Sequence, residues 1–310
     1  MNRHRRNAVD APARPGSRRP VARSWQNPIL AAAAAAFLAI APVAAQAAGD
    51  KITTADCGGA QADRPAATDR AVAAANGLGF DLLRSLADDK PGENVEISPY
   101  SIFLALGLAH MGAAGGTADA MASTMHVSGL DSFTLGLANA WTLNHVRCGG
   151  GEGADVRIAN GLWLADGFEA RVDYLARAQS QYRAEVAALD FASGDPAAPI
   201  NAWVRERTAG KIENAVARIP PLTVLMIVNT VYFKGRWTAP FDSALTEDAP
   251  FHKVDGSDKA VAMMRFPMNE RRLPYFEGDG VQSLRLAYGD DEALHMALFL
   301  PEAGRTRWSR

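Results

Sequence analysis

One segment, residues 224–233, is apolar on both faces when it is read with the two-residue period of a strand. Such a strand is typical of the middle of a sheet that is covered on both sides, so we expect a buried central strand here. Asn229 interrupts the apolar run. A buried amide is costly unless it is hydrogen-bonded, so the pattern alone predicts a core asparagine whose polar atoms are satisfied.

The composition is that of an ordinary globular protein. The chain has 310 residues, of which 48% are hydrophobic and 21% charged, and its formal net charge is −2. No basic stripe is interleaved with aromatic residues, so we expect no nucleic-acid partner. The length is sufficient for one domain with a substantial core.

The N-terminal residues resemble an export signal. Arginines between positions 3 and 23 precede an alanine-rich apolar run, residues 28–43, and Ala45-Gln46-Ala47 supplies small residues for cleavage. We therefore predict a signal peptide over residues 1–47 and an exported protein, extracellular or periplasmic. The alternative is a membrane anchor, but the run is shorter than the roughly 20 residues that span a bilayer, so we expect no stable membrane insertion. Ser17-Arg18-Arg19 leaves the choice between the general and the twin-arginine export routes open.

The two cysteines, Cys57 and Cys148, do not have the spacing of a zinc or thioredoxin-like site. In an exported protein they are compatible with one disulfide or with two separate thiols. No metal site is predicted.

The order of elements indicates an α+β fold, since helices with isolated strands come first and a run of strands follows. Residues 48–68 are predicted to be a disordered lead-in, and residues 69–301 a single domain. The expected helices cover about 72–86, 99–111, 117–121, 133–143, 172–182 and 198–208. The expected strands cover 94–97, 156–164, 184–190, 224–233, 261–266, 273–276, 281–288 and 293–300. Ser98 is predicted to cap the second helix, with Pro99 at its first position.

No constellation of catalytic residues is found. The six histidines show no ligand spacing, and the sequence contains no GxSxG, SxxK, P-loop or GxGxxG motif. The capping position accounts for Ser98 without a nucleophilic role. We therefore predict that the protein is not an enzyme and needs no cofactor.

Residues 229–241, NTVYFKGRWTAPF, resemble the signature NAVYFKGxWxxPF of the serpins, a family of protease inhibitors. Thr230 is the interior departure, because the family has a small residue there. Other segments match the family in the same order: residues 94–102, 112–117, 158–163, 200–212, 246–251, 263–264 and 275–301. The resemblance implies a domain of many helices with a large central mixed sheet and further β-rich sheets.

The resemblance also implies a mechanism. Serpins inhibit serine, and in some members cysteine, proteases: the protease cleaves an exposed reactive-centre loop, and the loop then inserts into the central sheet and traps the protease. By match, Ser98, Ser101 and Asn229 fall at the shutter, the polar cluster beneath the sheet where it opens. Trp237 falls at the breach, where the loop first enters. The matched helix across the sheet carries Asn201, Trp203 and Thr208.

The resemblance ends at Pro301, and residues 302–310 are interpreted as a tail unrelated to the family. The segment in which serpins carry the loop hinge, the loop with its P1 residue and the closing strands is not recognised. We therefore expect a truncated member that cannot trap a protease and has low stability. A frameshifted or truncated gene and a short functional protein are both open explanations. The alternative function is a secreted, non-inhibitory binding or structural protein that reuses the fold. The target protease and the oligomeric state are left open.

Overall fold

The computed structural model describes residues 63–302, except 150, 254, 268–272 and 291. These residues belong to one compact unit. The predicted signal peptide, residues 48–62 of the predicted lead-in, Cys57, and the tail from residue 303 onward lie outside the described residues. No helix in the described part is long and apolar enough to cross a membrane.

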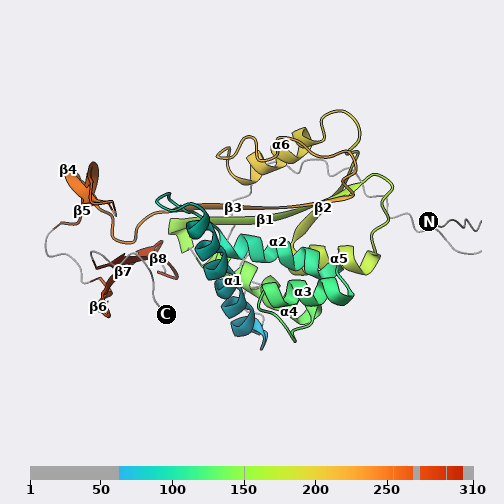
Figure 1. The fold of residues 1–310 in the computed structure, drawn as a ribbon, viewed down its shortest axis with the longest axis horizontal. Helices are drawn as coiled ribbons and strands as arrows, with labels where there is room; N and C mark the ends of the chain where they lie inside the picture. Colours follow the sequence, from blue (N-terminus) through green and yellow to red (C-terminus); the bar gives the residue numbers. More distant parts are fainter. Residues whose placement is uncertain (1–62, 150, 254, 268–272, 291, 303–310) are drawn as a thin grey trace, which may run out of the picture. The chain divides into compact units, whose positions relative to one another are not determined.

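The described chain has six α-helices, all of which lie between residues 68 and 207 (Figure 1). Asp131 starts α4 because its carboxylate accepts hydrogen bonds from the backbone N–H groups of Phe133 and Thr134, at 3.0 Å each. Pro99 begins α2, as predicted. The helices are α1 (Thr68–Asp89), α2 (Pro99–Gly112), α3 (Gly115–Thr124), α4 (Ser132–Cys148), α5 (Val172–Tyr182) and α6 (Ala197–Arg207).

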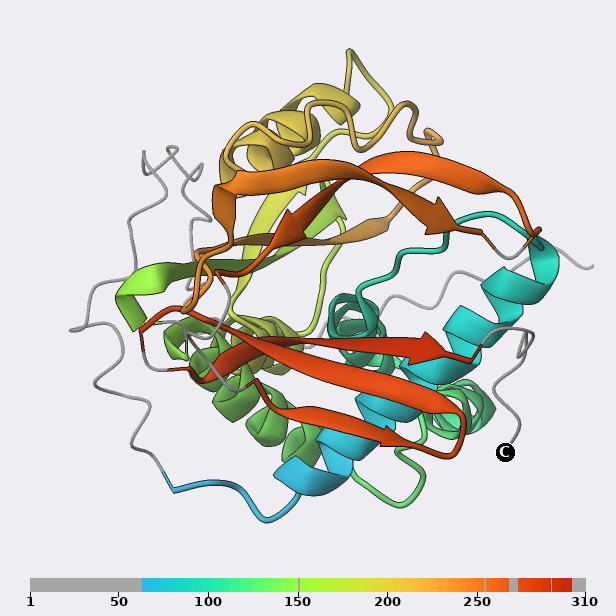
Figure 2. The same cartoon turned by 90° about the vertical axis from the view of Figure 1, so that its left-hand side faces the viewer.

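The described strands form three sheets. The mixed sheet has the order β2-β1-β3, in which β1 (Ala154–Ala165) pairs parallel with β2 (Ala184–Leu189) and antiparallel with β3 (Leu225–Gly235). β4 (Asp242–His252) and β5 (Asp258–Arg265) form an antiparallel pair. The red meander in Figure 2 is β6 (Tyr275–Gly278), β7 (Val281–Tyr288) and β8 (Leu294–Pro301). The α+β class predicted from the sequence is confirmed.

The central strand of the mixed sheet is β1, so the prediction that the strand over 224–233 is central is wrong for the described sheet. Its two faces are covered as expected, since Ile227 packs against one core and Met226 against the other. β3 pairs with β1 along one edge, and no described strand pairs with its other edge. Most of its side chains are half-buried, and Phe233 is 44% exposed. The apolar pattern marks a strand with covered faces, but it carries no information on how many neighbours the strand has. The predicted strand over 94–97 is also absent, because this segment is irregular and has no strand partner.

Helices cover the mixed sheet on both faces (Figure 1). On one face, Leu162 and Leu164 of β1 pack against α2 and α5. On the other face, Trp163 packs against Ile200 and Val204 of α6. This alternation follows from the two-residue period of β1 and places the two cores on opposite sides of one strand.

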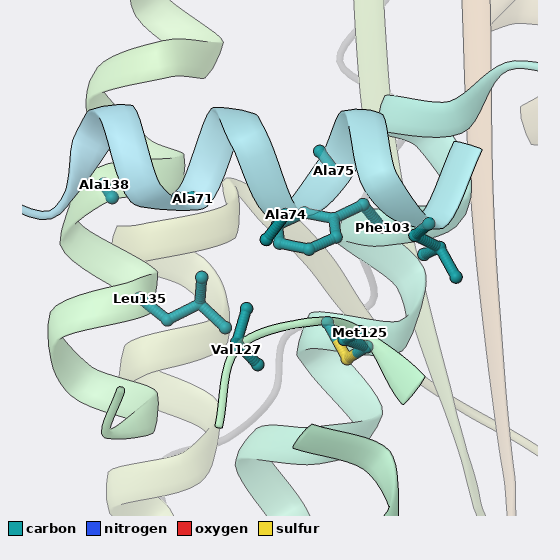
Figure 3. Close-up of a cluster of buried hydrophobic side chains, with 9 residues drawn as sticks. Ala71, Ala74, Ala75, Phe103, Met125, Val127, Leu135 and Ala138 are labelled. Carbon is teal, nitrogen blue, oxygen red and sulfur yellow. The ribbon is translucent and has the colours of Figure 1, made fainter. Parts of the chain in front are cut away.

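A third core joins α1 to α2 and α4 through small side chains (Figure 3). Ala71, Ala74 and Ala75 are almost fully buried, whereas Phe80 on the same helix is 65% exposed. The helices approach closely here: a Cβ atom on Gly79 would lie 2.6 Å from the Pro99 ring. Leu78 also belongs to this core, whereas four other apolar side chains of α1 are exposed: Val72, Phe80, Leu83 and Leu86.

Candidate functional site

A chain of polar side chains crosses the mixed sheet where Asn160 of β1 lies directly opposite Asn229 of β3. The Asn229 amide nitrogen donates to Asn160 Oδ1 at 2.7 Å, and the Asn160 amide nitrogen donates to the carbonyl oxygen of Tyr182 at 2.7 Å. The Ser101 hydroxyl of α2 donates to Asn229 Oδ1. The chain of hydrogen bonds therefore connects α2, β3, β1 and the end of α5.

This series of hydrogen bonds satisfies the polar atoms of Asn229, whose burial without partners would be energetically costly. Asn229 donates to Asn160 and accepts from Ser101. Asn160 is 1% exposed and both accepts and donates within the chain. In a low-dielectric interior such connected hydrogen bonds are strong, and removal of one member leaves its neighbours unpaired. The interaction fixes β3 to β1 and to the helix beneath the sheet.

The structure brings together Ser101 and Asn229 of the three residues matched to the shutter, and it leaves Ser98 apart. Ser98 is exposed, and its side chain makes no capping hydrogen bond, although it occupies the N-cap position of α2. The sequence reasoning missed Asn160 as a member of the cluster. Its signal was available, because Asn160 is a lone amide within a buried apolar strand, as Asn229 is in β3.

Two tyrosines, the buried Tyr182 and the half-buried Tyr100, form a second polar layer beside these hydrogen bonds. The Asn139 amide donates to the Tyr182 hydroxyl at 3.4 Å, and the Tyr100 hydroxyl donates to the Asn139 carbonyl oxygen at 3.3 Å. Burial raises the pKa of Tyr182 to about 12 and also raises the pKa of Tyr100 above its ordinary value. Both hydroxyls therefore stay protonated near neutral pH. Tyr182 is tightly enclosed, since a Cβ atom on Gly107 would lie 2.8 Å from its hydroxyl.

Trp237, the residue matched to the breach, lies just beyond β3 and packs against β7. Its ring stacks on Tyr288 with centroids 4.2 Å apart and an interplanar angle of 17°. The backbone joins the same two segments, because Thr238 N donates to the Ala287 carbonyl oxygen at 3.0 Å. Gly235 permits this contact, since a Cβ atom there would lie 2.5 Å from the Tyr288 ring. A cavity of about 240 Å³ lies beside Trp237.

The three residues matched to the helix across the sheet all lie at the contact of α6 with its surroundings. Trp203 meets Trp163 of β1 edge to face, with ring centroids 5.0 Å apart. Asn201 is buried and bonds both backbone groups of Val216 in the segment after α6. Thr208 is buried, and its hydroxyl accepts from the Ile212 N–H at 3.1 Å. These contacts attach α6 to the sheet and to the segment that follows it.

The described residues hold no group of three or more histidine, cysteine or acidic side chains that could bind a metal ion. The polar chain through Asn229 consists of neutral amides and a hydroxyl, without a base that could activate Ser101. This geometry suits a structural role, in which the hydrogen bonds hold β3 to β1 and to α2.

The profile of the family described as Serpin (serine protease inhibitor) matches residues 73–309. This range includes most of the residues that the sequence analysis assigned to a separate tail. An uncharacterized serpin-like protein of Thermococcus kodakarensis is 35% identical over 237 residues, which are 76% of this chain and 54% of that protein. The leukocyte elastase inhibitor of Bos taurus is 34% identical over 228 residues, 72% of this chain and 58% of that protein. The chain thus spans little more than half the length of these curated relatives.

Solved structures agree with the family. Cleaved kallistatin complexed with heparin gives a TM-score of 0.70 at 22% identity. The match covers 77% of this chain and 70% of the kallistatin chain, and at this identity it supports the fold alone. Arabidopsis AtSerpin1 in its native stressed conformation gives 0.67 at 25% identity, with 76% and 61% covered. The serpin resemblance predicted from residues 229–241 is confirmed, and the chain belongs to the serpin family of serine protease inhibitors.

Proposed function

We propose that this chain is the strand-accepting body of a serpin that inhibits serine proteases, and that residues 1–310 do not contain the loop that a protease attacks. The observation that carries the proposal is the outer edge of β3, which pairs with no described strand. An unpaired edge presents a row of backbone donors and acceptors to which an extended segment can add as a further strand.

The polar chain beneath β3 supports the role of a gate for this addition. Ser101 and Asn160 hold Asn229 from two sides, so β3 cannot shift relative to β1 or α2 without breaking hydrogen bonds. Strand insertion of the serpin type requires such movement within the sheet. We therefore assign the shutter role to Ser101, Asn160 and Asn229, with Trp237 at the end where an inserting strand would enter.

Export is part of the proposal. The arginine-rich and alanine-rich start of the chain supports it. Cys148 is disulfide-bonded, which is typical of proteins in oxidising compartments. The partner class is then an extracytoplasmic serine protease.

Strand acceptance predicts that a suitable peptide stabilises the protein. An acetylated 12-residue peptide of alternating threonine and alanine should pair with β3. At a free concentration of roughly 100 times its dissociation constant, it should raise the free energy of unfolding by about 2.7 kcal/mol. For a domain of this size that corresponds to an increase of about 5–10 °C in the midpoint of thermal unfolding.

A control peptide with proline at every third position cannot complete the backbone pairing. It should leave the midpoint unchanged. Equal shifts with both peptides, or no shift with either, would contradict strand acceptance and favour the alternative of a non-inhibitory protein that reuses the fold.

The proposal that the attacked loop lies outside residues 1–310 predicts that the 310-residue polypeptide does not trap a protease. Incubation with trypsin-, chymotrypsin- and subtilisin-like enzymes should give no SDS-stable complex on a denaturing gel. The leukocyte elastase inhibitor is a suitable positive control. A covalent band at the summed mass of this chain and the protease would overturn the assignment of the loop to a region outside residues 1–310.

The polar chain predicts the effect of the change Asn229→Ala. The variant leaves Asn160 Oδ1 without its donor in a buried position, so the free energy of unfolding should fall by about 1–3 kcal/mol in urea denaturation. Asn144→Ala is a matched control, because the hydrogen bond of Asn144 to Arg183 is solvent-exposed. It should cost less than about 0.5 kcal/mol. If both variants lost the same free energy of unfolding, the hydrogen bonds through Asn229 would not hold β3 in place.

A further inference from the structure

The segment that follows α6 is irregular but closely attached. Asn201, in the middle of α6, donates to the Val216 carbonyl oxygen at 2.8 Å and accepts from the Val216 N–H at 2.9 Å. One side chain therefore occupies both backbone groups of a residue that lies 15 positions further along the chain. Asn201 is 8% exposed, so water does not readily replace these bonds.

A second attachment follows three residues later. Ile219 is 7% exposed and belongs to the core that contains Trp163, Ile200 and Val204. Between the Asn201–Val216 contact and Ile219, the backbone is irregular, and Ala217 and Arg218 are exposed. Arg218 is therefore presented to solvent on a short stretch that is fixed on both sides.

We propose that the Arg218–Ile219 peptide bond is a cleavage site for arginine-specific, trypsin-like proteases, closed while α6 lies on the sheet and opened when α6 lifts from it. Asn201 is the positioning residue that keeps the site closed. This inference goes beyond the proposed inhibitory function and does not rest on it, because any event that detaches α6 would open the site.

The chemistry of the site fits this class of protease. A trypsin-like enzyme holds an arginine side chain through a carboxylate in its specificity pocket, and the exposed guanidinium of Arg218 suits it. Hydrolysis breaks the bond between the Arg218 carbonyl carbon and the Ile219 nitrogen. Water supplies the hydroxyl that completes the new carboxyl group and the hydrogen that completes the new amine, so no other reactant is needed.

The closed state follows from the two attachments. A protease binds the residues around the cleaved bond as an extended strand through their backbone groups. Both backbone groups of Val216 are already engaged by Asn201, and the side chain of Ile219 is held in the core beneath α6. Arg218 alone can reach a specificity pocket, whereas its neighbours cannot reach the rest of the active-site cleft.

The experiment treats the full chain with an arginine-specific protease and measures the rate of cleavage after Arg218 by mass spectrometry. Asn201→Ala should increase this rate at least tenfold, and the further change Arg218→Gln should abolish the new product. Asp131→Ala is the matched control, because it removes the cap of α4 and lowers stability without touching α6. It should change the rate less than twofold.

Hydrogen exchange on the unmodified chain provides a second readout if Asn201→Ala does not fold. The Val216 amide should be protected, whereas the amide of the exposed residue Ala217 should exchange rapidly. Rapid exchange at Val216 would overturn the proposal. So would equal cleavage rates after Arg218 in the unmodified chain and in a folded Asn201→Ala variant, or an equal increase in Asp131→Ala.

Discussion

The paired amides of Asn160 and Asn229 are the constraint on which the mixed sheet depends. They lie directly opposite each other on β1 and β3, and each satisfies a polar atom that burial would otherwise leave unpaired. A shift of β3 by one residue would turn Asn229 to the other face of the sheet and leave Asn160 without its donor. The amide pair therefore sets the register of β3, and Ser101 extends the same constraint to α2.

The two faces of the sheet follow from this register. Leu162 and Trp163, adjacent in β1, point into different cores, one closed by α2 and α5 and the other by α6. The face covered by α2 and α5 is tightly packed around Tyr182. Gly107 touches this tyrosine so closely that a side chain at position 107 would collide with its hydroxyl. The opposite face is covered by α6. Trp203 packs this helix against β1, and the hydrogen bonds of Asn201 to Val216 hold it to the segment that follows.

Much of the fold could be predicted from the sequence. Helix α5 begins and ends where the pattern places it, and β7 coincides with its predicted range. Strand β4 was missed because most of its side chains are exposed and show no apolar alternation. The number of strands that pair with β3 could not be predicted from the sequence, because strand pairing depends on distant segments and not on the local apolar pattern. On α1, the buried face is made mostly of small residues with Leu78, whereas the larger Val72 and Phe80 are exposed, so side-chain size alone does not identify the face that is buried.

The candidate site could be predicted only in part, because its residues come together through the pairing of distant strands. Asn229 was identified because it interrupts an apolar run, and Ser101 was identified through the family resemblance. Asn160 carries the same signal as Asn229, yet its importance depends on the register between two strands 69 residues apart. Ser98 was assigned to the cluster by position in a motif, but its extended backbone at the start of α2 leaves it exposed.

Amide hydrogen exchange with and without the alternating threonine–alanine peptide decides whether the edge of β3 accepts a strand. New protection is expected within β3, residues 225–235, because its outer edge gains a partner. No change is expected in β8, residues 294–301, which pairs with one strand among the residues that the structure describes. Protection of β8 in place of β3, or no change in either strand, would contradict the claim that the edge of β3 is built to accept a strand.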